Sequence, residues 1–179
     1  MELSIIRATE DKSCLNDIDR LNIEAFPDNE RVPTKKLLQF AKDGGELVAF
    51  YDKNEFIGFS YFKIGMGLTY ICFLAVDRSK RCMGYGRAIL ELMEKTFPDN
   101  NLVLEIEPLD EKDAPNYHQR VRRDRFYKSC GFSDSGYKSA YMGLVFEVYY
   151  KGEDFDISTF YALLDSMRGG KFQPKVYKS

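Results

Sequence analysis

A pair of glycines flanked by arginines has the residue types that bind a phosphate group. The tripeptide Gly84-Tyr85-Gly86 lies between Arg81 and Arg87, and the apolar run Tyr70–Val76 precedes it. That run contains no charge, glycine or proline, which predicts a strand buried on both faces. Glycine lets an anion approach backbone N–H groups because no Cβ stands in the way, and a helix N-terminus adds partial positive charge. The sequence therefore predicts a phosphate-binding turn between a strand and a helix.

The helix expected after this turn helps to distinguish it from two common nucleotide-binding loops. One face of this helix is formed by positions at helical spacing, which are Tyr85, Ile89, Leu92, Met93 and Thr96. Pro98 ends the helix. A dinucleotide-binding loop requires a third small residue where Ile89 stands. A nucleotide P-loop requires Gly-Lys-Ser/Thr, which the sequence lacks here. The turn is therefore expected to bind another phosphate compound.

Two motifs resemble those of the GCN5-related N-acetyltransferase (GNAT) family. The order Val76 … Arg81-Cys82-Met83-Gly84-Tyr85-Gly86 resembles the family's acetyl-CoA signature, Arg/Gln-x-x-Gly-x-Gly/Ala after a strand. The segment Arg125–Phe132 resembles its Leu-Tyr-x-Lys-x-Gly-Phe, where a helix ends at glycine. The resemblance covers residues 1 to about 150. It implies N-acetyl transfer from acetyl-CoA to an amine, with the loop amides holding the CoA pyrophosphate.

The resemblance also implies which residues contact the cofactor. Main-chain N–H groups near the end of the buried strand would hold the acetyl carbonyl, and the turn would hold the phosphates. The implied cofactor-binding residues are Phe73, Leu74, Ala75, Val76, Arg81, Cys82, Met83, Gly84, Tyr85, Gly86 and Arg87.

Acetyl transfer to an amine also needs groups that move protons. Tyr127 matches the family tyrosine that protonates the departing thiolate, although a core aromatic at a helix end is the alternative. A primary amine is mostly protonated at neutral pH, so a carboxylate or a water chain must take its proton. Glu105 and Glu107, at the end of the predicted strand Asn101–Glu107, are the candidates for that base. Strand alternation equally allows both to face solvent.

One departure from the family pattern concerns four arginines on one predicted helix. Arg120 and Arg123 stand where the family often has an Asn and an Ala that contact the pantetheine arm. This keeps a non-catalytic CoA-binding sensor or interaction module as an alternative function. Arg122 and Arg125 complete the cluster, for which salt bridges to the preceding acids are favoured over binding of CoA phosphates, an acidic acceptor or RNA.

Composition excludes several classes of protein. The chain has 179 residues, 44% hydrophobic and 30% charged, which is typical of one soluble domain. Its net charge of −2 argues against nucleic-acid binding. No apolar run approaches the roughly 20 residues of a membrane span, and the start carries acids where a signal peptide is basic. Four scattered cysteines predict reduced thiols in a cytoplasm, and no metal site is expected.

The predicted elements follow the order β-α-α-β-β-β-α-β-α-β-β, which is also the family's order. The fold class expected is α/β with a GNAT-like mixed central sheet and a C-terminal helical extension. We expect residues 1–150 to form the acetyltransferase domain. Residues 151–179 are predicted to add a helix over Asp156–Met167 that packs on this domain or on a second subunit in a homodimer. The basic tail Gly169–Ser179 is predicted to be loose.

The acetyl acceptor is expected to be a small-molecule or peptide amine, which the sequence does not name. The acidic residues Asp110, Glu111 and Asp113 could attract a cationic acceptor, although a solvated loop is favoured. His118, the only histidine, is expected to have a capping or surface role rather than a catalytic one. Cys82 lies inside the phosphate turn, where nearby positive charge favours its thiolate.

Overall fold

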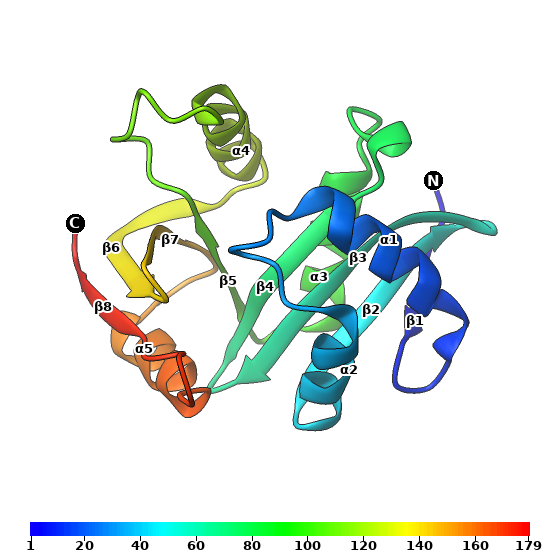
Figure 1. The fold of residues 1–179 in the computed structure, drawn as a ribbon, viewed down its shortest axis with the longest axis horizontal. Coiled ribbons are helices and arrows are strands. Elements are labelled where there is room, and N and C mark those ends of the chain that lie inside the picture. The colour runs from blue at the N-terminus through cyan, green and yellow to red at the C-terminus, as the bar shows by residue number, and fades with distance from the viewer. The chain divides into compact units, whose positions relative to one another are not determined.

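The computed structural model describes all 179 residues and confirms an α/β fold with an eight-stranded mixed sheet (Figure 1). The strands pair in the order β1-β2-β3-β4-β5-β7-β6-β8. The chain forms two compact units, one from Met1–Ile64 and Ile71–Pro98, the other from Gly65–Tyr70 and Asp99–Ser179. Strand β4 runs through both units, so each unit is described by itself.

The observed elements match the predicted order and add one strand. The strands are β1 (Leu3–Arg7), β2 (Gly45–Asp52), β3 (Glu55–Gly65), β4 (Leu68–Val76), β5 (Asn101–Ile106), β6 (Ser133–Tyr141), β7 (Leu144–Lys151) and β8 (Lys175–Lys178). The α-helices are α1 (Leu15–Ala25), α2 (Thr34–Lys42), α3 (Tyr85–Thr96), α4 (Tyr117–Ser129) and α5 (Ile157–Ser166). Two 3₁₀ turns, Lys12–Cys14 and Arg78–Lys80, precede α1 and α3.

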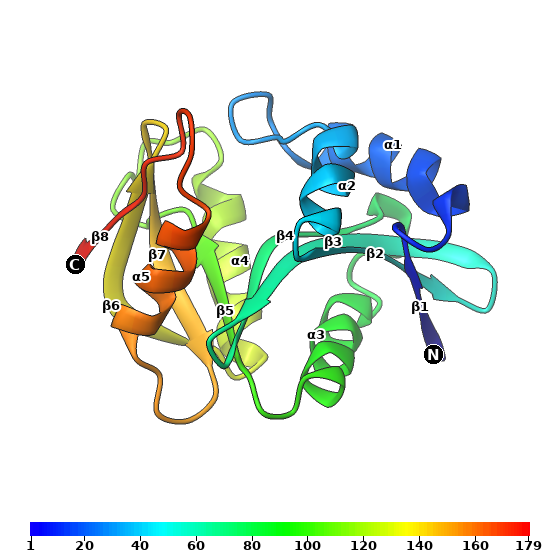
Figure 2. The same cartoon turned by 90° about the horizontal axis from the view of Figure 1, so that it is seen from below.

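The first unit packs three helices against the strands β1 to β4. Figure 2 shows α1 and α2 on one face of these strands and α3 on the other. The amphipathic spacing of α1 places Ile18 and Leu21 in a fully buried core with Leu37 of α2 and Phe59 of β3. This two-sided covering fixes the end of β4, from which the predicted phosphate turn starts.

Strand β4 differs in part from the expectation of a strand buried on both faces. Tyr70 and Ile71 are buried, whereas Cys72, Phe73 and Leu74 keep partial exposure. The apolar run therefore predicted the strand correctly, but its second half is not fully covered. That half holds the main-chain groups that the family resemblance assigned to the acetyl carbonyl.

The second unit is built on the antiparallel strands β5, β7, β6 and β8. Tyr149 of β7 donates a hydrogen bond to Asp124 of α4 at 2.5 Å, and the ring of Phe160 in α5 meets that of Tyr70 at 5.2 Å. Glu105 pairs with Val148, the neighbour of Tyr149, so Glu105 and Tyr149 point to opposite faces. Helices α4 and α5 accordingly lie on opposite sides of β7, as Figure 1 shows.

One local prediction was wrong. The tail predicted to be loose instead contains β8, whose residue Val176 pairs with Ser139 of β6. The backbone of β6 supplies the partners that this short polar segment could not reveal by itself.

Helix α5 begins as predicted, with Asp156 accepting a hydrogen bond from the backbone N–H of Ser158 at 2.9 Å. Its apolar residues Phe160, Leu163 and Leu164 are buried within the chain. The domain boundary at residue 150 and the homodimer stay predictions. No helix of the structure combines the length and apolarity needed to cross a membrane.

Candidate functional site

The predicted phosphate turn forms a short exposed loop in the first unit. The 3₁₀ turn Arg78–Lys80 follows β4, and the loop then runs through Arg81, Cys82 and Met83, which are all exposed, to the start of α3. Arg81 donates from Nε to the backbone carbonyl of Val76 at 3.0 Å, which ties the arginine to the end of the strand. Cys82 adopts a left-handed φ of 61°, which non-glycine residues rarely do.

Gly84 is the N-cap of α3 and has a left-handed φ of 87°. The N-cap residue has no side chain that could bind the backbone N–H groups of the first turn, which also lack intrahelical partners. Glycine fits because a side chain would be strained at this φ and would stand beside those N–H groups. Gly86, two positions after Gly84, is the second residue of α3. The geometry is that of an anion site at a helix N-terminus with Arg81 beside it.

Asp77 anchors the start of the loop. Its carboxylate accepts hydrogen bonds from the backbone N–H and the hydroxyl of Ser79, at 3.0 and 2.7 Å, and from Arg20 of α1 at 2.8 Å. These hydrogen bonds stabilise the charged form and lower the pKa of Asp77 to about 2. The loop is therefore fixed to both the end of β4 and helix α1.

We expect Asp77→Ala to lose about 1 kcal/mol of stability at pH 7, the usual effect of removing an N-cap. Because the folded-state pKa is lowered, the stability that Asp77 contributes is present above its unfolded value of about 3.9 and is lost as pH falls toward about 2. Urea unfolding of both proteins at pH 7 and at pH 3 tests this. A difference that is absent at pH 7, or equally large at pH 3, would contradict it.

A matched control exists in the second unit, where Asp156 and Ser158 repeat the same Asp-x-Ser cap at the start of α5. Asp156→Ala should also reduce stability. Only Asp77→Ala should in addition weaken CoA binding, because only that cap positions the phosphate loop.

Tyr85 and the strand residues Phe73 to Val76 are placed by further contacts in the first unit. Tyr85 is buried and donates its hydroxyl to Asp52 at 2.9 Å, which fixes the first turn of α3 and raises the pKa of Tyr85. Ser60 of β3 donates to the carbonyl of Phe73 at 2.8 Å. A Cβ on Gly58 would lie 2.2 Å from the carbonyl oxygen of Ala75, so only glycine allows this close approach of β3 and β4.

Glu105 of β5 lies in a cluster of hydroxyl groups in the second unit. Tyr70 and Ser139 donate their hydroxyl hydrogens to its carboxylate, and Tyr141 does so at 2.6 Å. Burial raises the pKa of Glu105, against the opposing effect of these three hydrogen bonds. The side chain of Glu105 is partly exposed. Glu105 is therefore neither fully buried nor the solvent-facing residue that the alternation of the strand allowed.

Glu107 has a different environment from Glu105. It is 8% exposed, forms an ion pair with Arg123, lies 3.6 Å from Arg120 and accepts a hydrogen bond from Asn116 at 2.5 Å. Arg120 also binds Glu111 at 2.9 Å and the carbonyl of Pro108 at 3.0 Å. The expected salt bridging of the helix arginines is therefore confirmed for Arg120 and Arg123. Together these contacts hold the acidic loop onto α4.

Tyr127 lies near the end of α4 with its ring packed and its hydroxyl unbonded. The ring meets Phe126 at 5.1 Å and Phe132 at 5.6 Å. No hydrogen bond from any protein group reaches its hydroxyl, in contrast to Tyr149, whose hydroxyl binds Asp124. Burial raises the pKa of Tyr127, and the charge of Arg123 opposes this. The phenol therefore stays protonated at neutral pH.

The predicted residues thus fall into separate groups. All predicted cofactor-binding residues lie in the first unit, and Tyr127, Glu105 and Glu107 lie in the second. Within the second unit, Arg123 touches Glu107 and influences Tyr127, whereas Glu105 has its own partners. Sequence reasoning missed Tyr70, Ser139 and Tyr141, because hydroxyl residues on strands carry no spacing signal. His118 is exposed on α4.

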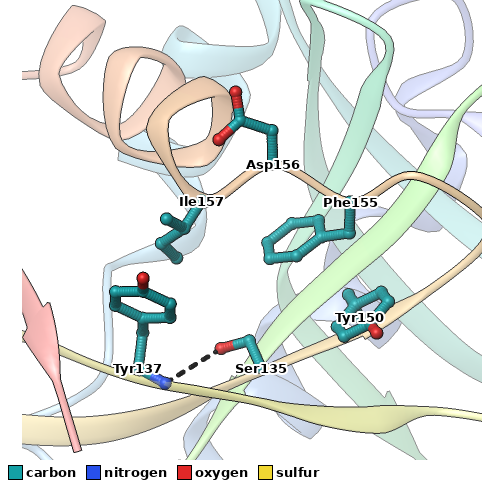
Figure 3. Close-up of a pocket in the computed structure, with 6 residues that line it drawn as sticks. All are labelled: Ser135, Tyr137, Tyr150, Phe155, Asp156 and Ile157. Carbon is teal, nitrogen blue, oxygen red and sulfur yellow. Dashed lines mark hydrogen bonds between the residues drawn. The ribbon is translucent and has the colours of Figure 1, made fainter.

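The second unit also has a pocket of about 460 Å³ that contains none of the predicted residues. Figure 3 shows Phe155 over Tyr150 on one side, Tyr137 on the other and Ser135 below. The rings of Tyr150 and Phe155 stack at 4.5 Å. The carboxylate of Asp156 points away from these rings, because it caps α5. The pocket therefore presents rings and hydroxyls, and no group suited to acetyl transfer.

The structure thus combines a mixed α/β sheet with a glycine at the N-terminus of α3 and a packed tyrosine near the end of α4. The family model of the acetyltransferase (GNAT) family matches residues 15–132. The chain therefore belongs to the GNAT family. No relative was found among curated proteins.

Solved structures of GNAT acetyltransferases have the same fold. A protein from Bacteroides thetaiotaomicron assigned to the family is 22% identical, with a TM-score of 0.71, covering 90% of this chain and 92% of its own. An aminoglycoside 6'-N-acetyltransferase complexed with coenzyme A is 16% identical, with a TM-score of 0.61 and coverage of 84% and 96%. A chimera of spermidine N-acetyltransferase SpeG from Vibrio cholerae and hSSAT is 12% identical, with a TM-score of 0.62 and coverage of 84% and 95%.

Proposed function

We propose that this protein transfers an acetyl group from acetyl-CoA to the nitrogen of an amine. The observation that carries the proposal is the loop before α3, where a left-handed Gly84 leaves the first-turn N–H groups uncapped beside Arg81 in a chain of the GNAT family. The aminoglycoside acetyltransferase of the same fold was solved with coenzyme A, which supports this choice of cosubstrate.

The loop suits the pyrophosphate of CoA in its charge and in its exposure. Residues 81–84 are exposed, Arg81 and Arg87 carry positive charge, and the N-terminus of α3 adds the helix dipole. The second half of β4, from Phe73 to Val76, would hold the acetyl carbonyl through main-chain N–H groups. The loop and the end of β4 would therefore bind and orient acetyl-CoA.

Glu105 is the better of the two candidate bases. Glu107 is held by Arg120 and Arg123, and an ion-paired carboxylate is a weak base because its charged form is already stabilised. Glu105 has a raised pKa, partial exposure and no cationic partner. A primary amine with a pKa of about 10.4 is neutral in only about one molecule in 2,500 at pH 7, so removal of its proton is a substantial part of the barrier.

The protons balance with Glu105 and Tyr127 in these roles. Acetyl-CoA supplies the thioester, and the carbon–nitrogen bond forms as the carbon–sulfur bond breaks. Glu105 takes one proton from the acceptor ammonium and releases it to solvent. Tyr127 gives its hydroxyl proton to the leaving sulfur and is reprotonated with the second proton from nitrogen. The hydroxyl of Tyr127 has no other hydrogen-bond partner in the protein, and its raised pKa keeps it protonated until the thiolate leaves.

The proposal is tested by supplying a panel of amines and measuring the release of free CoA thiol. Spermidine, an aminoglycoside, lysine and short peptides are each supplied with acetyl-CoA, and mass spectrometry locates the acetyl group on the product. Thiol release that depends on an amine, with the acetyl group on nitrogen, is the expected result. CoA binding by calorimetry without any turnover would instead favour a non-catalytic CoA-binding module.

Arg81→Ala tests the charge of the loop. Removing hydrogen bonds to a charged group costs about 1–3 kcal/mol, so CoA should bind roughly 5- to 150-fold more weakly. Calorimetric titration gives the affinity, and dephospho-CoA serves as a second ligand that keeps the pyrophosphate. An Arg81→Ala protein that binds both ligands with wild-type affinity would show that Arg81 does not contact the pyrophosphate.

A further inference from the structure

Glu105 has no cationic partner within the protein for the ionised form of its carboxyl group. Its three partners, Tyr70, Ser139 and Tyr141, are neutral hydroxyl groups, and no cationic side chain contacts it. Glu107, two residues further along the chain, is paired with two arginines, Arg120 and Arg123. Because a buried carboxylate normally pairs with a cation, the Glu105 cluster is complementary to a positively charged ligand.

The cluster also has the right hydrogen-bond character for an ammonium group. Each hydroxyl uses its only hydrogen on Glu105, so the cluster has no remaining donor to offer a ligand. An ammonium group has three donors and no acceptor. A carboxylate or phosphate ligand would be repelled at this place, whereas a protonated amine would be held.

Two of the three hydroxyl residues are held by the C-terminal extension. The ring of Tyr70 meets Phe160 of α5 edge-on at 5.2 Å, and the ring of Tyr141 meets Phe172 at 4.9 Å. Phe160 is fully buried. Both phenylalanines lie beyond residue 132, where the match to the family model ends. The phenols that bind Glu105 therefore pack against residues that follow β7.

The segment that carries Phe172 is itself fixed at both ends. Gly169 and Phe172 exchange two backbone hydrogen bonds, at 3.1 and 2.8 Å. Arg168 binds Asp165 of α5 and donates to the carbonyl of Pro174 at 3.2 Å. Strand β8 then pairs with β6, the strand of Ser139 and Tyr141. Phe172 is thus held in a fixed place against the ring of Tyr141, the residue that binds Glu105.

We propose that Glu105 anchors the ammonium group of the acetyl acceptor. We further propose that residues 157–172 of the extension select which cationic amines reach Glu105. The acceptor class is a primary amine that arrives protonated and carries an aliphatic chain, which the rings of Tyr141 and Phe172 cover. Phe160 and Phe172 are positioning residues, since they act through Tyr70 and Tyr141. The inference rests on the proposed acetyl transfer.

The first experiment replaces Glu105 and measures binding as well as turnover. In Glu105→Gln the affinity for hexylamine, titrated by calorimetry in the presence of CoA, should fall roughly 10- to 100-fold, the range for a hydrogen bond to a charged group. Affinity for CoA should not change. Glu107→Gln is the matched control and should leave hexylamine affinity unchanged. Equal hexylamine affinity in wild type and Glu105→Gln overturns the proposal.

The second experiment tests the extension with Phe172→Ala. The KM for hexylamine should rise several-fold and the KM for ethylamine much less, because the longer chain uses the ring. Phe172→Leu should restore most of the preference, and Tyr177→Ala, an exposed aromatic on β8, should have no effect. CoA affinity and melting temperature are measured on every variant. An unchanged ratio of the two KM values in a folded Phe172→Ala protein overturns the role of the extension.

The outcomes separate this inference from the proposed function. If the wild-type protein acetylates no amine, the proposed acetyl transfer fails, and hexylamine binding by calorimetry still decides whether Glu105 anchors an ammonium group. If wild-type acetylation occurs but Glu105→Gln and Phe172→Ala behave like wild type, the inference alone fails. Should Phe172→Ala not fold, Phe172→Val gives the same comparison with a smaller change.

Discussion

Gly84→Val is expected to abolish CoA binding in a protein that still folds. The glycine has a φ of 87°, a conformation that a β-branched residue adopts only under strain. Valine would either push the loop out of shape or place its methyl groups beside the uncapped N–H groups of α3. In both cases the pyrophosphate loses its backbone donors. Calorimetric titration with CoA is the measurement, with circular dichroism to show that the fold is retained.

The matched control is Gly143→Val in the β6–β7 turn. Gly143 also has a left-handed φ, of 79°, and a Cβ there would meet no atom within 4 Å. Its valine variant therefore carries the same kind of backbone strain in the other unit. Both variants should lose stability to a similar degree, and only Gly84→Val should lose CoA. Wild-type CoA affinity in a folded Gly84→Val protein would remove the loop from the cofactor site.

Tyr127→Phe is expected to lower kcat roughly 100-fold, the low end of general acid–base catalysis, while CoA affinity and melting temperature change little. The substitution keeps the ring, and with it the packing on Phe126 and Phe132. It deletes a hydroxyl that makes no hydrogen bond within the protein, so the fold has little to lose. Steady-state kinetics with the best acceptor of the amine panel measures the effect.

Two tyrosines serve as controls for this change. Tyr137→Phe removes a hydroxyl from the pocket of Figure 3, outside the predicted site, and should leave kcat unaltered. Tyr149→Phe deletes the hydrogen bond to Asp124 and should reduce stability instead. Full kcat in Tyr127→Phe would exclude a catalytic role for Tyr127. A joint loss of stability and activity would mean that its hydroxyl supports the fold.

The elements with a local signal could be predicted from the sequence. The end of α4, which runs over Tyr117–Ser129, was predicted from Gly131, and Gly84 marked the start of α3. Strand β8 could not be predicted, since Lys175–Lys178 is short and polar and becomes a strand only through its pairing with β6. Propensity describes a segment alone, whereas pairing depends on distant residues.

The candidate site was predictable to a similar extent. The phosphate turn follows from glycine and arginine types in one short stretch, and the two glutamates follow from their place on a strand. The different environments of Glu105 and Glu107 do not follow from the sequence. Glu105 meets Tyr70, Ser139 and Tyr141, which are 34 to 36 residues away in sequence, through the register of β5, β7 and β6. Such register is set by the tertiary structure, so the choice between Glu105 and Glu107 needed the fold.

Strand β8 has a consequence for the behaviour of the protein in concentrated solution. It is the last strand of the pairing order, and an edge strand is a template to which another chain can add. Lysines stand at both of its ends, Lys175 and Lys178, with Val176 and Tyr177 between them. Two copies that approached edge to edge would bring these charges together and repel. High ionic strength screens that repulsion, so dilute buffers favour the dispersed protein over edge-to-edge aggregates.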